Sequence, residues 1–166
     1  MRHIISILLQ NEAGALSRVA ALFSTRGYNI ESLSVAPTED PQISRMTLVT
    51  TGSDAAIDQI TKQVLKLVDV VNMADMTMDD HIEREMLLMK VKVNAGADAK
   101  LREVVEKAGA SVLDDSLETF TVELTGTNDR VDAFIASMGK CSDITAVVRS
   151  GAMAIARGHN VLGANF

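Results

Sequence analysis

Hydrophobic and polar positions along the first half of the chain switch between two spacings. Short apolar or alternating runs are typical of strands, whereas apolar positions three or four residues apart are typical of amphipathic helices. In chain order the pattern predicts a strand, a helix, two strands, a helix and a strand, at residues 4–9, 15–26, 29–35, 44–50, 54–67 and 68–73. The predicted order β-α-β-β-α-β is the ferredoxin-like arrangement.

The second half of the chain repeats this order. Strands are predicted at residues 86–93, 111–114, 119–124 and 144–148, with helices at residues 97–107 and 129–138. Residue identities also recur at one constant spacing, because Thr51-Gly52 matches Thr125-Gly126 and Asp58 matches Asp132. The repeat predicts an α+β protein with two tandem ferredoxin-like βαββαβ domains.

The predicted domains are separated by changes in composition. The first domain covers residues 1–77, a polar and acidic linker covers residues 78–85, and the second domain covers residues 86–150. The stretch at residues 151–166 is rich in Gly and Ala, which favours a C-terminal tail with weak structure.

The predicted strands are more apolar than a sheet with one water-facing side permits. Ile4-Ile5, Leu8-Leu9 and Val70-Val71 put apolar groups on both faces of the sheet. An uncovered apolar face and a bare strand edge both favour association. We expect a second copy of the chain to cover them, and the alternative is that the two halves cover each other within one chain.

Composition narrows the class of protein. The chain has 166 residues, 47% apolar and 23% charged, which is typical of a folded globular protein. Its net charge of -6 argues against nucleic-acid binding, and no apolar run approaches the roughly 18 residues of a membrane span. The single cysteine, Cys141, fits a reducing compartment, and no secretory signal is found, so we expect a cytoplasmic protein.

Chemical motifs give no positive sign of an enzyme. The three histidines lack metal-ligand spacing, and neither a P-loop, a nucleophile elbow nor a dinucleotide fingerprint occurs. Aromatic residues are only 3% of the chain, so a base-stacking platform is not available. We predict no metal ligands and no catalytic residues, although composition alone leaves an enzyme possible.

The first strand-to-helix turn, residues 10–18, is the most informative stretch. Gly14 lets the backbone come close to a small ligand, and free N–H groups at a helix start suit a carboxylate. The amide of Asn11 could hold an amino group or cap the helix. These residues alone leave open a capped helix without a ligand, and Asn29 by itself is typical of a turn.

The same turn carries a family resemblance. Asn11–Val19 and Phe23–Leu33 resemble an ACT domain and, more narrowly, the regulatory (small) subunit of bacterial acetohydroxyacid synthase, also called acetolactate synthase. The resemblance continues at residues 35–38, 44–47 and 66–70 and, more loosely, at residues 83–85 and 132–134. It identifies the first domain, residues 1–77, as an ACT domain.

The resemblance implies a regulatory subunit with no active site or cofactor of its own. It implies that the chain binds a catalytic large subunit, which uses thiamine diphosphate, magnesium and FAD in branched-chain amino acid biosynthesis. The small subunit would raise the activity of that enzyme and make it sensitive to valine, or to leucine or isoleucine. The resemblance also implies a homodimer formed through the ACT domains.

The resemblance also places the effector. The carboxylate and side chain of valine would lie on the turn at residues 11–16, here called the effector loop, and a facing chain would complete the pocket. The implied residues are Asn11, Ala13, Gly14, Ala15 and Leu16 of the loop, with Asn29 and Ile30 of the facing chain. Two other functions stay open, namely a stand-alone amino-acid sensor for another enzyme or transporter, and a small enzyme on the ferredoxin-like fold.

Overall fold

The computed structural model describes residues 1–163, which pack as two compact units. The first unit contains Met1–Ile82 together with residues 152–163, and the second contains Glu83–Gly151. Each unit has the order β-α-β-β-α-β, so the predicted α+β class with two ferredoxin-like halves is confirmed.

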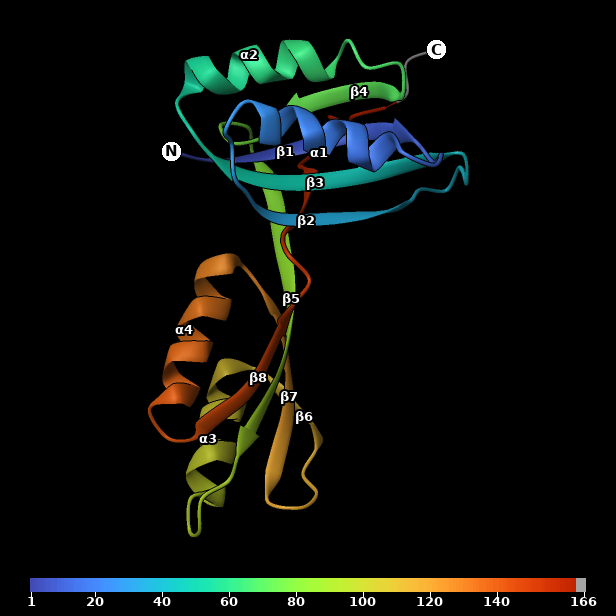
Figure 1. Ribbon diagram of the computed structural model, residues 1–166. Coiled ribbons are helices and arrows are strands. Elements are labelled where there is room, and N and C mark those ends of the chain that lie inside the picture. The colour runs from blue at the N-terminus through green and yellow to red at the C-terminus, as the bar shows by residue number, and fades with distance from the viewer. Residues whose placement is uncertain (164–166) are drawn as a thin grey trace. The chain divides into compact units, whose positions relative to one another are not determined.

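The first unit has a four-stranded antiparallel sheet with strand order β2-β3-β1-β4. Its elements are β1 (Arg2–Gln10), α1 (Ala15–Thr25), β2 (Ile30–Pro37), β3 (Ile43–Thr51), α2 (Asp54–Val64) and β4 (Val70–Asp75). Helices α1 and α2 lie along one side of this sheet (Figure 1). Strands β2 and β4 form its two edges.

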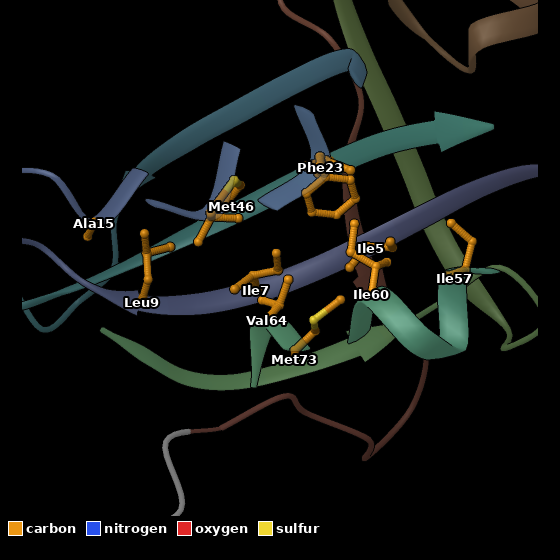
Figure 2. Close-up of a cluster of buried hydrophobic side chains, with 12 residues drawn as sticks. Ile5, Ile7, Leu9, Ala15, Phe23, Met46, Ile57, Ile60, Val64 and Met73 are labelled. Carbon is orange, nitrogen blue, oxygen red and sulfur yellow. The ribbon is translucent and has the colours of Figure 1, made fainter. Parts of the chain in front are cut away.

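The core of the first unit lies between the sheet and these helices (Figure 2). Alternate positions of β1 point into it, and α2 presents positions three and four residues apart, as strand and helix periodicity require. The labelled side chains are Ile5, Ile7, Leu9, Ala15, Phe23, Met46, Ile57, Ile60, Val64 and Met73. Full burial of each large apolar side chain contributes about 1.5–3 kcal/mol.

The second unit repeats the arrangement with strand order β6-β7-β5-β8. Its elements are β5 (His81–Lys92), α3 (Asp98–Ala108), β6 (Ser111–Asp114), β7 (Thr119–Gly126), α4 (Asn128–Gly139) and β8 (Asp143–Arg149). The repeat extends to helix capping. The hydroxyl of Ser53 accepts a hydrogen bond from the N–H of Ala56 at the start of α2, and Thr127 does the same for Arg130 in α4.

The predicted linker, residues 78–85, is wrong at residues 81–85. β5 begins at His81, so residues 81–85 belong to a strand. Glu85 is only 3% exposed, and Arg149 of β8 pairs with its carboxylate, which offsets the cost of burying the charge. The polar composition of residues 81–85 does not predict a strand. A charged residue that is buried with a partner cannot be told from a solvent-exposed charged residue by sequence alone.

The weakly structured tail is also a wrong prediction. Residues 153–156 form strand β9 (Met153–Ala156), and Ala152 and Ala154 are buried. They pack against Ile4, Val49 and Met76 on the sheet face opposite the helices. We call residues 152–163 the C-terminal segment. Within the first unit, this segment covers apolar surface for which the sequence pattern predicts cover by a second copy.

Candidate functional site

The effector loop ends in an unusual helix start. Gly14 is the N-cap of α1 and has φ +88°, in the left-handed region that favours glycine. No side chain caps α1, and its first turn has no acidic residue. Each of α2, α3 and α4 carries an Asp in the first turn. Of the four helices within residues 1–163, α1 therefore has the N-terminus best suited to an external carboxylate.

Asn11 fastens the effector loop to the turn between β2 and β3. Its Nδ2 donates a hydrogen bond to the carbonyl of Pro41 at 2.9 Å, and its backbone N–H donates to the carbonyl of Gln42 at 2.7 Å. A hollow of about 380 Å³ lies beside these contacts. The Asn11 amide thus positions the loop within this chain, and one of its donors is already engaged.

An ion pair next to the effector loop helps to hold it in place. The spacing of its two residues in the sequence does not indicate this pair. Arg18 of α1 donates from Nε and Nη2 to both carboxylate oxygens of Asp69, with the Nη2–Oδ1 distance 3.0 Å. The Cβ of any larger residue at Gly14 would lie 2.8 Å from Nη1 of Arg18. The hydrogen bond from Arg18 lowers the pKa of Asp69 and outweighs the opposing effect of burial.

The other predicted loop residues differ in their surroundings. Ala15 is buried in the core of the first unit, so its side chain cannot touch a ligand, whereas Ala13 is exposed. Leu16 is 37% exposed beside the start of α1. The backbone N–H of Ala15 already donates to the carbonyl of Glu12 at 3.3 Å, so the loop offers N–H groups at residues 14 and 16 and an apolar side chain at residue 16.

Asn29 and Ile30 lie at the opposite end of the same sheet. Ile30 pairs with Thr50 of β3, whereas Gln10, next to the effector loop, pairs with Ile43 at the other end of β3. Asn29 is exposed, and its carbonyl accepts a hydrogen bond from Thr50 Oγ1 at 2.7 Å. A single chain therefore does not bring the two halves of the predicted site together.

A buried histidine elsewhere in the first unit lies beside a carboxylate. His3 is 3% exposed, and its Nδ1 lies 3.0 Å from Oδ2 of Asp75. Burial raises the pKa of Asp75, but hydrogen bonds from Thr77 and His3 outweigh it and leave that pKa below its ordinary value. Among the residues that the structure describes, no cluster of three His, Cys, Asp or Glu side chains suits a metal, and no helix could span a membrane.

Two family models match the chain, one in each half. Residues 5–72 match an AHAS small subunit-like ACT domain, and residues 84–158 match the small subunit of acetolactate synthase. The chain is 44% identical over 162 residues to the acetolactate synthase isozyme 3 small subunit of Salmonella typhimurium, covering 98% of this chain and 99% of that one. It is equally identical over 163 residues to the acetolactate synthase small subunit of Haemophilus influenzae, covering 98% and 100%.

A solved structure agrees with these sequence matches. The acetolactate synthase small subunit of Thermotoga maritima superposes with a TM-score of 0.87 at 33% identity, covering 96% of this chain and 99% of that one. Both halves of the chain, its full length and its fold thus match one family. The chain belongs to the acetolactate synthase small subunits, and its first unit is an ACT domain.

Proposed function

We propose that this chain is the regulatory subunit of an acetolactate synthase in branched-chain amino acid biosynthesis. It activates a separate catalytic subunit and makes that subunit sensitive to valine. Family membership supports the first role, and the uncapped start of α1 behind Gly14 is the observation that carries the second. The condensation itself belongs to the catalytic subunit, with its thiamine diphosphate, magnesium and FAD.

The effector loop holds the carboxylate of valine by backbone groups. The N–H groups of residues 14 and 16, at the start of α1, donate to the carboxylate, and the positive end of the helix dipole adds to the attraction. Gly14 leaves room for this approach because it has no side chain. Leu16 offers an apolar wall to the isopropyl group of valine.

A second copy of the chain completes the pocket. β2 is an edge strand, and its antiparallel pairing with β2 of another copy would place residue 30 of one copy beside the end of β2 in the other. That end leads into the turn that holds Asn11 through Pro41. Asn29 and Ile30 of one copy then face the effector loop of the other, which resolves their separation within a single chain.

Valine regulates through unequal binding to two arrangements of this interface. An effector shifts an equilibrium only by its differential affinity for the two states. A coupling of about 1–3 kcal/mol is typical of allosteric proteins and is sufficient for feedback control.

Acetolactate formation by purified subunits tests the proposal. We expect no acetolactate from this chain alone, higher activity when it is added to a catalytic subunit, and lower activity when valine follows. The variant Gly14→Asp should lose valine inhibition, because the new carboxylate occupies the place of the ligand's carboxylate.

A matched control is available in the second unit. Gly96 precedes α3 and has φ +81°, and a Cβ added at this glycine would have no neighbouring atom within 4 Å. Gly96→Asp therefore makes the same change at a comparable turn and should leave valine inhibition intact. Full valine inhibition with Gly14→Asp would show that the assigned pocket is wrong, and acetolactate from this chain alone would refute the regulatory role.

A further inference from the structure

A second cavity lies in the first unit, away from the effector loop. It has a volume of about 280 Å³ and lies between the C-terminal segment and the sheet face opposite the helices. Arg45 and Met76 line it from the sheet side, and Ala156 and Leu162 line it from the segment. Its size is at the lower end of the range for ligand sites, about 300–1,000 Å³, so its occupant is small.

Arg45 gives this cavity its chemical character. The guanidinium is half-buried, and its Nη1 donates to Ser6 Oγ at 3.3 Å and its Nη2 to the carbonyl of Leu162 at 2.8 Å. Both acceptors are neutral. Within residues 1–163 no carboxylate pairs with Arg45, whereas Arg18 pairs with one and Arg149 with two.

An arginine in this position favours an anionic ligand. Among the described residues the guanidinium has two neutral acceptors and no counter-ion, so its lost hydration is only partly compensated. The planar guanidinium matches a carboxylate in a two-pronged hydrogen bond. The remaining walls are mainly apolar, with Ala74, Met76 and Ala156 among them, so they suit a short hydrocarbon chain.

We propose that this cavity binds a small aliphatic monocarboxylate, with its carboxylate on Arg45 and its hydrocarbon chain against Met76 and Ala156. The site is distinct from the effector loop and does not depend on it. Because the C-terminal segment forms one wall, the bound ligand also fastens this segment to the sheet. A branched-chain fatty acid and a free amino acid share this chemistry, and Asp79 at the cavity is suited to the ammonium of an amino acid.

Binding of 3-methylbutanoate to the full chain tests this site. The titration uses the Gly14→Asp background, in which the effector loop is blocked, and follows both heat and backbone amide NMR shifts. We expect saturable binding with shifts near residues 45, 74–76 and 154–162. Arg45→Gln should weaken the binding of 3-methylbutanoate by about tenfold or more. The uncharged 3-methylbutan-1-ol should bind to the protein with intact Arg45 no more tightly than 3-methylbutanoate binds to Arg45→Gln.

Two further variants keep the result interpretable. Ala74→Leu fills the cavity without changing Arg45, so it should abolish binding even if Arg45→Gln loosens the C-terminal segment. Arg26→Gln removes an exposed arginine at the end of α1 and should change nothing. A parallel titration with valine and Asp79→Asn identifies the source, because only an amino acid should lose affinity with that change.

The contradicting results are equally specific. The proposal fails if 3-methylbutanoate does not bind saturably at millimolar concentration. It also fails if Arg45→Gln and Ala74→Leu both bind like the parent, or if the amide shifts cluster away from the cavity. None of these failures affects the assignment of the effector loop, which Gly14→Asp tests separately.

Discussion

The guanidinium of Arg18 lies against the point where a side chain at residue 14 would begin. The start of α1 is therefore constrained twice, by the left-handed backbone of Gly14 and by the ion pair of Arg18 with Asp69. The effector loop is held in shape before any ligand arrives. This preorganisation reduces the entropy that binding must overcome.

The lowered pKa of Asp69 predicts a pH dependence of stability. Because its folded-state pKa is lowered, the pair with Arg18 stabilises the fold above the ordinary carboxyl pKa of about 4. This contribution is lost as pH falls through the lowered folded-state pKa. The parent should thus have a larger free energy of unfolding than Asp69→Asn at pH 7, and the difference should shrink below about pH 4.

Urea unfolding of both proteins at a series of pH values measures this difference. Other carboxylates contribute equally to parent and variant, so their titration cancels. A difference that stays constant down to pH 2, or that grows with acid, would show that the ion pair does not stabilise the fold in this way.

At the scale of single residues, the sequence indicates the turn that forms the effector loop but not the ion pair that holds this turn in place. Gly14 and Asn11 stand in a local turn, and local turn chemistry is readable from neighbouring residues. The contact of Arg18 with Asp69 joins positions 51 residues apart, and nothing in the local pattern marks such a pair. The family resemblance assigns Ala15 to the ligand, although its side chain belongs to the core.

Among the elements, the C-terminal segment is the one that differs most from its prediction. Strong periodicity marks the other elements, and Ser53 and Thr127 also cap α2 and α4, so most of these elements fall within a few residues of their expected bounds. Ala152 and Ala154 give no such signal, because small side chains are compatible with a loop as well as with close packing. Their burial against Ile4 and Val49 is a tertiary contact, which the local sequence pattern does not indicate.

Docking of the C-terminal segment predicts the effect of a buried charge. Ala154 is 7% exposed and Met153 is 51% exposed, so Ala154→Asp buries a carboxylate whereas Met153→Asp does not. We expect Ala154→Asp to weaken docking by roughly 2 kcal/mol or more. Amide hydrogen exchange should then accelerate at Ala154 and Arg157, whose N–H groups donate to Thr47 Oγ1 and to the carbonyl of Asp80.

Met153→Asp serves as the control and should leave exchange in this segment unchanged. Equal protection in the parent and in Ala154→Asp would show that the segment is not held by burial of its alanines. In that case its place on the sheet would have to depend on other contacts.

At the scale of the whole molecule, the edge of β2 is where we expect two copies of the chain to pair. An edge strand with free backbone groups pairs readily with a second copy unless charges or prolines protect it. Val35 of β2 is 39% exposed, and Val147 of the edge strand β8 is 41% exposed. The two valines therefore form a matched pair for testing which edge is used.

We expect Val35→Lys to weaken the dimer by about tenfold or more, because the new charge lies at the proposed interface. Val147→Lys should leave the dimer intact. Light scattering over a dilution series measures both dissociation constants. A dimer insensitive to Val35→Lys, or one disrupted by Val147→Lys, would contradict pairing through β2.

The central claim is that one valine site needs the effector loop of one copy and Asn29 of another. Its most direct test is valine calorimetry on a mixture of two defective variants, Gly14→Asp and Asn29→Ala. A mixed dimer places both changes in one site and leaves the other site intact. The account predicts that neither variant binds valine alone and that binding returns after the two are mixed and allowed to exchange. If the exchanged mixture binds no valine, or if Asn29→Ala alone binds like the parent, the site does not span two copies.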